Sequence, residues 1–358
     1  MPGSEVNVAL VGGGRIADMH APGYLAHPHA RLFALCDVDA GVLARRKAEW
    51  GLERTYLSYD ELLADPDVDA VEILTPHHLH HPMVLAAARA GKHVSVQKPM
   101  AMTITECDEM IAACHQAGVR FKVFENFVFY PPYRRAREVL DAGEIGDPLC
   151  IRTRLGAGYG GWEIPLRAWA WRLNEAESGG GPTVFDDGYH KFSVAMDFFG
   201  PVASVTGWIE RTLAVVDSPA ALCWRHDNGV LGYMDAALTP NLYIEGDYYP
   251  ADERVEITGT KGSLYVSMCT GRPVEAPPLI VRRGGRTIAH TDLETDWLAS
   301  FSASAADFVD AIREGRDPHL TGERGRDVTA FALGALEAAR TGKTVRPGQP
   351  ATEVSHVT

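Results

Sequence analysis

Apolar and polar positions alternate in two different rhythms along the chain. Up to about residue 125, short apolar runs are separated by segments with helical spacing, which predicts buried strands joined by helices. The strands are expected at 6–11, 31–36, 70–74, 93–96 and 119–124, and the helices at 39–50, 59–64, 82–90 and 103–117. Because strands and helices alternate, this part is predicted to be an α/β domain with a doubly wound parallel sheet.

The rhythm changes after Pro131-Pro132, where longer strand-like segments begin. Asp227-Asn228-Gly229 and Gly259-Thr260-Lys261-Gly262 lie between apolar runs and predict hairpins. Strands are expected at 149–155, 203–213, 219–226, 230–237, 253–258 and 263–268, and helices near 133–142, 186–199, 299–313 and 325–340. The second half therefore predicts an α+β domain with an open, mainly antiparallel sheet.

Length, composition and charge limit the number of domains, the possible partners and the compartment. The 358 residues are long for one core, so we predict a first domain at 1–126, a second at 127–345 and a loose tail at 346–358. The net charge of −13 disfavours nucleic acid or an acidic membrane as a partner. No apolar stretch is long enough to span a membrane, and the first strand begins too early to leave room for a secretion signal. Six cysteines without a CxxC pair indicate free thiols in a reducing cytoplasm.

The first apolar run ends in the glycine-rich stretch 12–17, with the sequence GGGRIA. Gly12 permits a sharp turn, Gly14 lets the backbone approach a pyrophosphate, and Ala17 is small enough for helix–strand packing. The next run ends in Asp37, where a carboxylate accepts hydrogen bonds from an adenosine ribose and repels a 2′-phosphate. N–H groups at the start of the helix add an anion site. We therefore predict a site for NAD rather than NADP, formed by Gly12, Gly14, Arg15, Ile16 and Asp37.

Lys98 directly follows a predicted strand, in Gln97-Lys98-Pro99. Ligands of open α/β sheets bind at the carboxyl ends of the strands, so Lys98 is expected beside the cofactor. An ammonium group next to a positive nicotinamide ring loses its proton more readily, which suits proton transfer. The alternative is an ordinary surface lysine on a loop.

The stretch 179–190 contains three glycines followed by Asp186 and His190. If it is helical from Asp186, the two side chains lie one turn apart on one face. The carboxylate could then orient the imidazole, or both groups could bind a sugar hydroxyl. The alternative is a glycine loop with a capping aspartate and a structural histidine.

Two further clusters have more than one interpretation. His77, His78, His80 and His81 crowd one loop, but consecutive residues cannot all face one ion, so no metal site is predicted. The segment 152–172 is rich in arginine and tryptophan, which suits a sugar with an anionic substituent or an arm that faces another subunit. The candidate substrate-binding residues from this region and the preceding helix are Tyr133, Arg152, Arg154, Trp162, Arg167, Trp169 and Arg172.

Together these motifs resemble the glucose–fructose oxidoreductase / inositol dehydrogenase (Gfo/Idh/MocA) family. The motifs are Gly12-x-Gly14-x-x-Ala17, Thr75-Pro76 with His80, Gly91-Lys92-His93-Val94 leading to Gln97-Lys98-Pro99, and Asp186-x-Gly188-x-His190. The likeness extends from Val6 to about Val345 and implies a Rossmann domain followed by an open-sheet domain that often mediates oligomerisation. It also implies hydride transfer at a secondary alcohol of a sugar or cyclitol, with Lys98, Asp186 and His190 in the catalytic positions. The implied cofactor contacts further along the chain are Thr75, Pro76, His80, Gln97, Lys98 and Asn126.

Three departures from the family pattern bear on the reaction. Gln97 replaces the usual glutamate, Val128 stands where many relatives have arginine, and one extra residue separates the glycines from Asp186. The last two departures resemble family members that act on intact glycosides. Some of those members are redox-neutral NAD-dependent glycosidases, sulfoquinovosidases among them.

We therefore expect an NAD-dependent enzyme that removes hydride from a pyranoside ring carbon, with C3 as the expected position. Lys98 would take the hydroxyl proton, and His190 and Asp186 would hold or relay it; Tyr133, Tyr189 or a histidine could be a further acid or base. The alternative is a glycosidase that oxidises the ring, eliminates the aglycone, adds water and reduces back, with an anionic glycoside as substrate. A non-catalytic NAD-binding sensor is disfavoured, because no helix-turn-helix or basic patch supports it and because Lys98 and His190 are present. The expected partners are a small sugar or glycoside and further copies of the chain, as a dimer or tetramer formed through the C-terminal sheet.

Overall fold

The computed structural model describes residues 5–162, 169–211, 216–267, 270–272 and 274–348. By their contacts, these residues divide into two compact units. Unit 1 comprises residues up to Asn126 with Ala176–Gly179 and Phe301–Thr329, and unit 2 comprises Phe127–Glu175, Gly180–Ser300 and the residues from Ala330 onward. This division follows contacts rather than chain order, and the domain limits given above stay a prediction. No helix in the described part of the chain is both long and apolar enough to cross a membrane.

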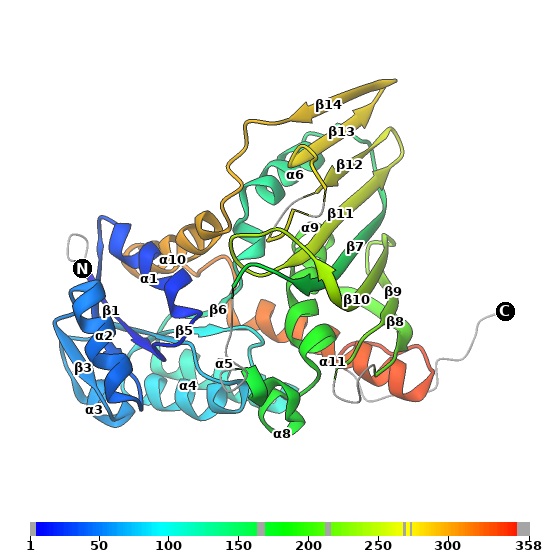
Figure 1. Cartoon of the computed structure of the whole chain (residues 1–358). Coiled ribbons are helices and arrows are strands. Elements are labelled where there is room, and N and C mark those ends of the chain that lie inside the picture. Colours follow the sequence, from blue (N-terminus) through cyan, green and yellow to red (C-terminus); the bar gives the residue numbers. More distant parts are fainter. Residues whose placement is uncertain (1–4, 163–168, 212–215, 268–269, 273, 349–358) are drawn as a thin grey trace. The chain divides into compact units, whose positions relative to one another are not determined.

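Unit 1 contains a six-stranded sheet in the order β3-β2-β1-β4-β5-β6, in which every neighbouring pair is parallel (Figure 1). The strands are β1 (Val6–Val11), β2 (Ala30–Cys36), β3 (Arg54–Tyr56), β4 (Ala70–Ile73), β5 (His93–Gln97) and β6 (Phe121–Phe124). The helices between them are α1 (Ala17–Ala26), α2 (Ala40–Trp50), α3 (Tyr59–Ala64), α4 (His80–Arg89) and α5 (Ile104–Ala117). The predicted doubly wound parallel sheet is therefore confirmed. The order reverses between β1 and β4, the place where such sheets bind ligands.

Local signals explain why the helix limits of unit 1 could be predicted closely. Asp39 caps α2 by accepting the N–H of Gly41 at 2.7 Å, and Gly51 ends the helix in the left-handed region at φ +65°. Thr103 and Glu106 form a capping box at the start of α5. The edge strand β3 was not predicted, because three half-buried residues carry too short an alternation to be recognised.

Unit 2 contains an eight-stranded sheet in the order β14-β13-β12-β11-β7-β10-β9-β8. Only the β7–β10 pair is parallel, so the prediction of a mainly antiparallel sheet is confirmed. The strands are β7 (Pro148–Tyr159), β8 (Val202–Ile209), β9 (Ala220–His226), β10 (Leu231–Tyr243), β11 (Ala251–Gly259), β12 (Gly262–Val266), β13 (Leu279–Arg283) and β14 (Arg286–His290). Both predicted hairpins are present, at β9–β10 and β11–β12.

The helices of the second half are α6 (Pro131–Asp141), α8 (Glu175–Ser178), α9 (Gly188–Phe199), α10 (Trp297–Glu314) and α11 (Gly322–Thr341). Short 3₁₀ segments lie at His77–Leu79, Phe127–Phe129 and Ala170–Leu173. The helix predicted from residue 186 differs from the structure: Pro182–Asp187 form a π-helical segment, and α9 begins only at Gly188. The hairpin β13–β14 was also missed, although Gly284 and Gly285 both have positive φ values, of 53° and 73°, as its tight turn requires.

The two faces of the unit 2 sheet differ in burial. Along β9 and β10 the buried positions alternate with exposed ones, and Leu222 pairs with Met234 on the buried face. Helix α9 packs on this face, where Phe192 contacts the ring of Trp224. The opposite face carries exposed side chains such as Tyr233 and Trp208. Side chains on that face point away from α9.

Candidate active site

The glycine-rich loop after β1 has the geometry expected of a dinucleotide-binding turn. Gly12 has φ +102°, and a Cβ there would lie 3.0 Å from the carbonyl oxygen of Leu74, so only glycine fits. A Cβ at Gly14 would meet nothing within 4 Å, so the exposed side of the loop has room for a ligand. Helix α1 starts at Ala17, and Ile16 provides no side-chain cap for its first N–H groups. The loop therefore fits a pyrophosphate, as NAD requires.

Asp37, at the end of β2, is fixed by two backbone donors. Its Oδ2 accepts the N–H of Gly13 at 2.7 Å, and its Oδ1 accepts the N–H of Asp39 at 2.9 Å. A carboxylate has about four acceptor sites, so capacity remains for ribose hydroxyls. The carboxylate thus connects the end of β2 to the glycine-rich loop.

Arg46 also holds the glycine-rich loop, and sequence reasoning did not identify it. Its side chain is only 7% exposed, its Nε donates to the carbonyl oxygen of Gly13 at 3.2 Å, and its guanidinium pairs with Asp18 at 2.5 Å. The guanidinium also lies 4.6 Å from the ring centroid of Trp50. No motif marks this residue, because its partners lie 28 or more positions away in the chain or one helical turn along α2.

The carboxyl ends of β4 and β5 are connected by His80. Its Nδ1 lies 2.9 Å from the carbonyl oxygen of Pro99, and its Nε2 lies 2.9 Å from that of Thr75. Thr75-Pro76 and Lys98, which the family resemblance assigns to the cofactor site, therefore lie at adjacent strand ends. Asn126, the last residue of unit 1 in this stretch, is buried two residues beyond β6.

The other histidines of this loop bind different groups. His77 Nδ1 lies 2.8 Å from the carbonyl oxygen of Ser178, His78 Nδ1 lies 3.3 Å from that of Glu177, and His81 pairs with Glu109 at 2.7 Å. Among the residues that the structure describes, no group of three or more histidine, cysteine or acidic side chains could hold a metal ion.

Lys98 is half-buried and follows the last residue of β5. Its backbone N–H donates to the side-chain Oε1 of Gln97 at 2.7 Å, and its peptide bond to Pro99 is cis. The amide of Gln97 therefore sets the backbone at the start of the loop that carries the lysine.

In unit 2, Asp186 lies in the π-helical segment Pro182–Asp187. The segment has wider turns than an α-helix, and the N–H of Asp186 donates to the carbonyl oxygen of Gly181 at 3.3 Å. A π-turn arises when one residue is added to an α-helix. The extra residue noted between the glycines and Asp186 is thus accommodated in this turn.

Asp217 anchors the start of that segment from the loop between β8 and β9. Its carboxylate accepts the N–H of Thr183 at 2.7 Å and the N–H of Val184 at 2.6 Å. Burial raises the pKa of Asp217, and the two N–H donors oppose the rise. A Cβ at Gly181 would lie 2.0 Å from the carboxyl carbon, so glycine is required there. Sequence reasoning missed Asp217 because it is distant in the chain.

Asp186 itself is buried and paired with Arg172, whose Nε donates to Oδ2 at 2.6 Å. The guanidinium of Arg172 lies 4.5 Å from the ring centroid of Trp171. Next in the chain, Asp187 accepts the hydroxyl of Tyr249 at 3.0 Å. Burial and the charge of Asp187 raise the pKa of Tyr249 well above its ordinary value, so this hydroxyl stays a donor.

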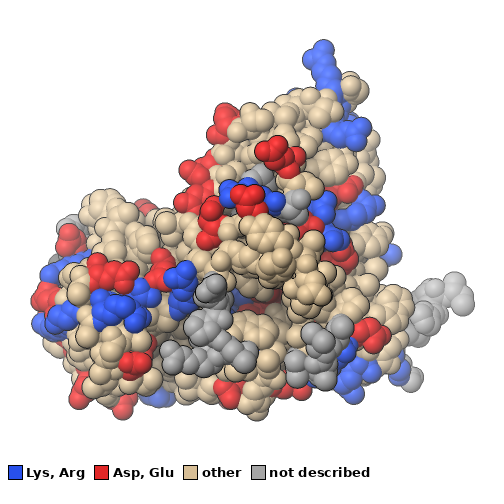
Figure 2. Space-filling model, viewed as in Figure 1, with Lys and Arg blue, Asp and Glu red and all other residues tan. Residues whose placement is uncertain are grey.

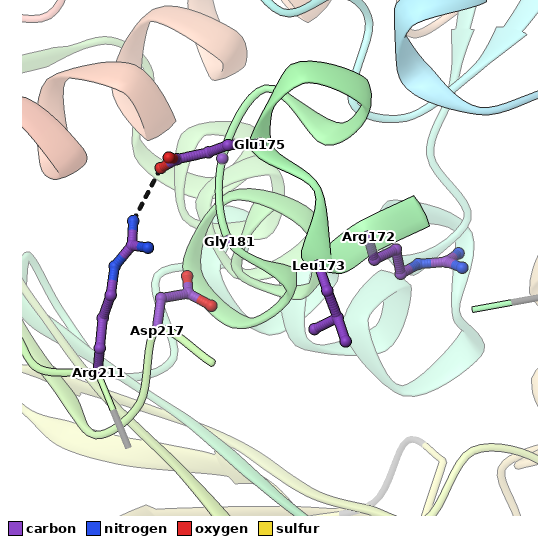
Figure 3. Close-up of a pocket in the computed structure, with 7 residues that line it drawn as sticks. Arg172, Leu173, Glu175, Gly181, Arg211 and Asp217 are labelled. Carbon is purple, nitrogen blue, oxygen red and sulfur yellow. Dashed lines mark hydrogen bonds and ion pairs between the residues drawn. The ribbon is translucent and has the colours of Figure 1, made fainter. Parts of the chain in front are cut away.

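A small cavity lies beside this turn (Figure 3), lined by Arg172, Leu173, Glu175, Gly180, Gly181, Arg211 and Asp217. Arg211 pairs with Glu175 across it at 2.8 Å, and Figure 3 shows the Arg172 side chain directed away from Asp217. Its volume of about 60 Å³ has room for water but not for a sugar ring.

His190, on α9, stacks on Phe127 with ring centroids 4.0 Å apart and planes at 21°. The ammonium of Lys191 lies 4.1 Å from the same Phe127 centroid and pairs with the buried carboxylate of Glu253 at 2.5 Å. Thr270 donates to the second oxygen of that carboxylate at 2.7 Å. The position of the His190 ring is therefore fixed by an aromatic neighbour that is itself held by a buried cation.

The remaining candidates from the sequence occupy different places in unit 2. Tyr133 is buried among aromatic rings on α6, with its ring centroid 5.7 Å from that of Tyr130. Trp162 contacts the rings of Tyr248 and Trp297, with centroids 5.6 Å and 6.3 Å away. Trp169 is half-buried just before Ala170–Leu173. Arg167 lies outside the described residues.

Arg152 and Arg154 lie on the exposed face of the sheet, away from α9. Arg152 pairs with Glu256 at 3.0 Å, and Arg154 pairs with Asp235 at 2.7 Å and with Asp252 at 2.8 Å. Basic and acidic side chains are also mixed over the face of the molecule shown in Figure 2. This position favours the alternative in which the two arginines face another subunit.

The comparisons with known proteins agree with this geometry. The family description "Oxidoreductase family, NAD-binding Rossmann fold" matches residues 6–125, and "GFO/IDH/MocA C-terminal domain" matches residues 133–265. The chain is 30% identical to a 1,5-anhydro-D-fructose reductase of Ensifer adhaerens over 93% of this chain and 96% of the relative. It is 26% identical to the scyllo-inositol 2-dehydrogenase (NAD(+)) of Bacillus subtilis, over 88% of this chain and 89% of that one.

Among solved structures, the chain is similar to the aldose–aldose oxidoreductase of Caulobacter crescentus complexed with glycerol. The TM-score is 0.82 at 26% identity, and the match covers 96% of this chain and 99% of that one. Both units are therefore shared with structurally known oxidoreductases. With the NAD site of unit 1 and the open sheet of unit 2, these matches show that the chain belongs to the Gfo/Idh/MocA family of NAD-dependent oxidoreductases.

Proposed function

We propose that this enzyme oxidises a secondary hydroxyl on the ring of a sugar, cyclitol or glycoside, with C3 as the position attacked on a pyranoside. The observation that carries the proposal is the strand-end arrangement of unit 1, where the glycine-rich loop, Asp37 and the Lys98 loop all follow parallel strands. The names of the relatives support the substrate class, because an anhydrofructose, an inositol and an aldose are all ring polyols or their ketones. When bound, NAD accepts the hydride from the ring carbon.

We assign proton transfer to Lys98. The hydroxyl must lose its proton as the ring carbon loses hydride, and a lysine at the carboxyl end of a strand can accept it. His190 and Asp186 are proposed to hold the reacting hydroxyl or to relay its proton. The charge-assisted bond from Arg172 and the anchor at Asp217 would keep the Asp186 carboxylate in a fixed orientation.

The test is a screen of free sugars, cyclitols and glycosides that follows both NADH absorbance and aglycone release. Reduction of the product with borodeuteride, followed by mass spectrometry, locates the oxidised carbon. A 3-keto product from at least one pyranoside supports the proposal. NADH formed only from substrates without a ring hydroxyl would refute it.

A second candidate is the redox-neutral glycosidase, in which a 3-keto group acidifies the C2 proton and permits elimination of the aglycone. Val128 and the extra residue accommodated in the π-turn before α9 favour it, because these two departures resemble family members that act on intact glycosides. Aglycone release without net NADH would assign this function. The relatives reported above are named as a reductase, a dehydrogenase and an oxidoreductase, so oxidation remains our first proposal.

We further propose that the exposed face of the unit 2 sheet joins copies of the chain into a homo-oligomer. Trp208, Leu231 and Tyr233 are 71%, 37% and 38% exposed there, beside the ion pairs of Arg152 and Arg154. Apolar side chains bordered by paired charges are typical of protein interfaces. Sedimentation of the parent protein and of Trp208→Glu tests this: the parent is expected to be a dimer or tetramer and the variant to dissociate. A monomeric parent would contradict it.

A further inference from the structure

A chain of hydrogen bonds runs through the core of unit 1 and begins at a buried carboxylate. Glu72 on β4 is 0% exposed, and its two oxygens bind the hydroxyl of Tyr24 and the Nδ1 of His20, both on α1 and both 0% exposed. Burial and the charge of Glu72 raise the pKa of Tyr24 well above its ordinary value, so the phenol donates. Most buried polar groups in folded proteins are hydrogen-bonded, and these three satisfy one another.

The chain continues to the Lys98 loop. The second nitrogen of His20, Nε2, lies 2.9 Å from Nε2 of Gln97. The Oε1 of Gln97 accepts the backbone N–H of Lys98 at 2.7 Å. Four side chains thus connect the interior of the Rossmann sheet to the residue that we assign to proton transfer.

The direction of each bond follows from the donors available. Because Oε1 of Gln97 accepts from Lys98, its NH₂ group faces His20, and Nε2 of His20 must be the acceptor. The proton of a neutral imidazole then lies on Nδ1, where it donates to Glu72. Every bond is satisfied by one neutral histidine and one carboxylate. A glutamate at position 97 would bring no proton to Nε2, so His20 would have to carry a second one.

We propose that His20, Glu72 and Tyr24 are positioning residues that hold the Gln97 amide in one orientation and thereby fix the backbone of Lys98. The proposal rests on the role of Lys98 given above. It also explains why glutamine replaces the glutamate usual at this motif: the glutamine is matched to a histidine whose other nitrogen is bound to a buried carboxylate.

Aromatic rings pack against the buried histidine of the network. The His20 ring lies 4.1 Å from the ring of Phe124 and 5.1 Å from that of Phe301. Charged groups that interact with Glu72 lie on β6 and α10, where the buried Lys122 pairs with Asp307 at 2.7 Å. Burial lowers the pKa of Lys122, while Asp307 and Glu72 oppose the shift.

The test exchanges the two ends of the network. Gln97→Glu removes the donor to His20, and Glu72→Gln replaces one of the two oxygens that bind His20 and Tyr24 with an NH₂ donor. Each single variant is therefore expected to lower kcat at least ~10-fold with little change in the KM for NAD. In the double variant the chain can run in reverse, from an amide at position 72 through His20 to a carboxylate at position 97. The net charge and the number of bonds are then restored, and kcat is expected to recover to within about threefold of the parent.

A matched control lies on the same strand. Ser95 on β5 is 0% exposed, and its hydroxyl has no hydrogen-bond partner among the described residues, so Ser95→Ala should leave kcat unchanged. The second readout does not need a substrate: the rate at which acetic anhydride labels Lys98, measured by peptide mass spectrometry. The rate should change in both single variants and return in the double variant.

The outcomes separate the two proposals. If the single variants lower the melting temperature but leave kcat and the labelling rate of Lys98 unchanged, the network only stabilises the fold and the inference is wrong. A double variant no better than the single variants would also overturn it, because the direction of the bonds would then not matter. If Lys98→Met remains active, the assignment of proton transfer fails. The positioning network still stands if the labelling rate of Lys98 changes in the two single variants and returns in the double variant.

Discussion

The two stretches that carry the predicted catalytic residues are built differently. Lys98 follows a regular buried strand, and its position is set by its neighbour Gln97 and by the network behind it. Asp186 lies in an irregular π-turn that is fixed by Arg172, 14 positions away, and Asp217, which binds Thr183 from 34 positions away. Strand order therefore brings Lys98 to the sheet edge, where the network fixes its loop, whereas the Asp186 turn follows no strand and is held by side-chain contacts alone.

This difference predicts how each stretch responds to change. A strand end keeps its place as long as the sheet is intact, so substitutions there should affect chemistry more than folding. A turn anchored by two buried contacts loses its shape when one anchor is removed, so folding and activity should fall together. The first three predictions below test this contrast, in order of decreasing expected effect.

Lys98→Met should lower kcat by roughly 10²- to 10⁴-fold, the range for the loss of a general acid or base. The melting temperature and the affinity for NAD, measured by calorimetry, should change little, because the strand that precedes it is undisturbed. A variant with a near-normal kcat would move the proton-transfer role to another residue.

His190→Ala should also remove most activity. Its ring stacks on Phe127, so the loss of a stacking contact is an alternative cause. His190→Phe keeps the stack without the nitrogens and is the matched control. Activity retained by the phenylalanine variant would show that His190 is structural; an increase in KM alone would make it a binding group.

Asp217→Ala should destabilise the fold by about 1–3 kcal/mol and lower kcat at the same time. The reason is that the N–H groups of Thr183 and Val184 would be left without acceptors in a buried site. Asp217→Asn keeps one acceptor oxygen and should lie between the parent and the alanine variant in both urea unfolding and kcat. A shift in the midpoint of urea unfolding with no change in kcat would show that Asp217 does not affect Asp186.

NAD should bind at least tenfold more tightly than NADP, a difference of at least ~1.4 kcal/mol, because a 2′-phosphate would meet the Asp37 carboxylate. Asp37→Ser should reduce this difference in affinity between NAD and NADP. In Asp37→Asn the side chain loses its charge but can still accept the N–H of Gly13. This variant therefore separates the repulsion of a 2′-phosphate from the support of the glycine-rich loop. Equal affinities of the parent for the two cofactors by calorimetry would contradict the assignment.

The arginines provide the most selective test of substrate charge. If the substrate is an anionic glycoside, removal of the arginine that binds it should cost about 2–5 kcal/mol on that substrate alone. Arg152 and Arg154 lie on the exposed sheet face, so their variants should alter assembly rather than turnover, whereas Arg172→Gln should act through Asp186. Equal turnover of an anionic glycoside and its neutral glucoside by the parent would refute an anion site.

The sequence predicted the regular parts well, because their signals are local. The glycines of the first loop, the cap Asp39 and the capping box at Thr103 each mark a boundary within a few residues. The Gly284-Gly285 turn between β13 and β14 carries a comparable local signal. The strand ends therefore placed Asp37 and Lys98 correctly after β2 and β5.

The contacts that fix the candidate site could not be predicted in the same way. Asp217, Arg46 and the His20–Glu72 pair act on residues far away in the chain, and no spacing rule connects them to their partners. The π-turn at Pro182–Asp187 also had no pattern of its own, since its residues fit an ordinary helix start. Long-range packing selects these arrangements after the regular elements have formed.

The most direct test of the proposed hydride transfer is a single turnover with excess enzyme, NAD and pyranosides or cyclitols that carry deuterium at one ring carbon. We predict that deuterium from C3 of a pyranoside appears in NADH, detected by mass spectrometry, and that deuterium at C2 or C4 does not. In the Lys98→Met enzyme the same transfer should be slowed by roughly 10²-fold or more. Turnover of the substrates without transfer of deuterium from any ring carbon to the nicotinamide would contradict the proposed reaction.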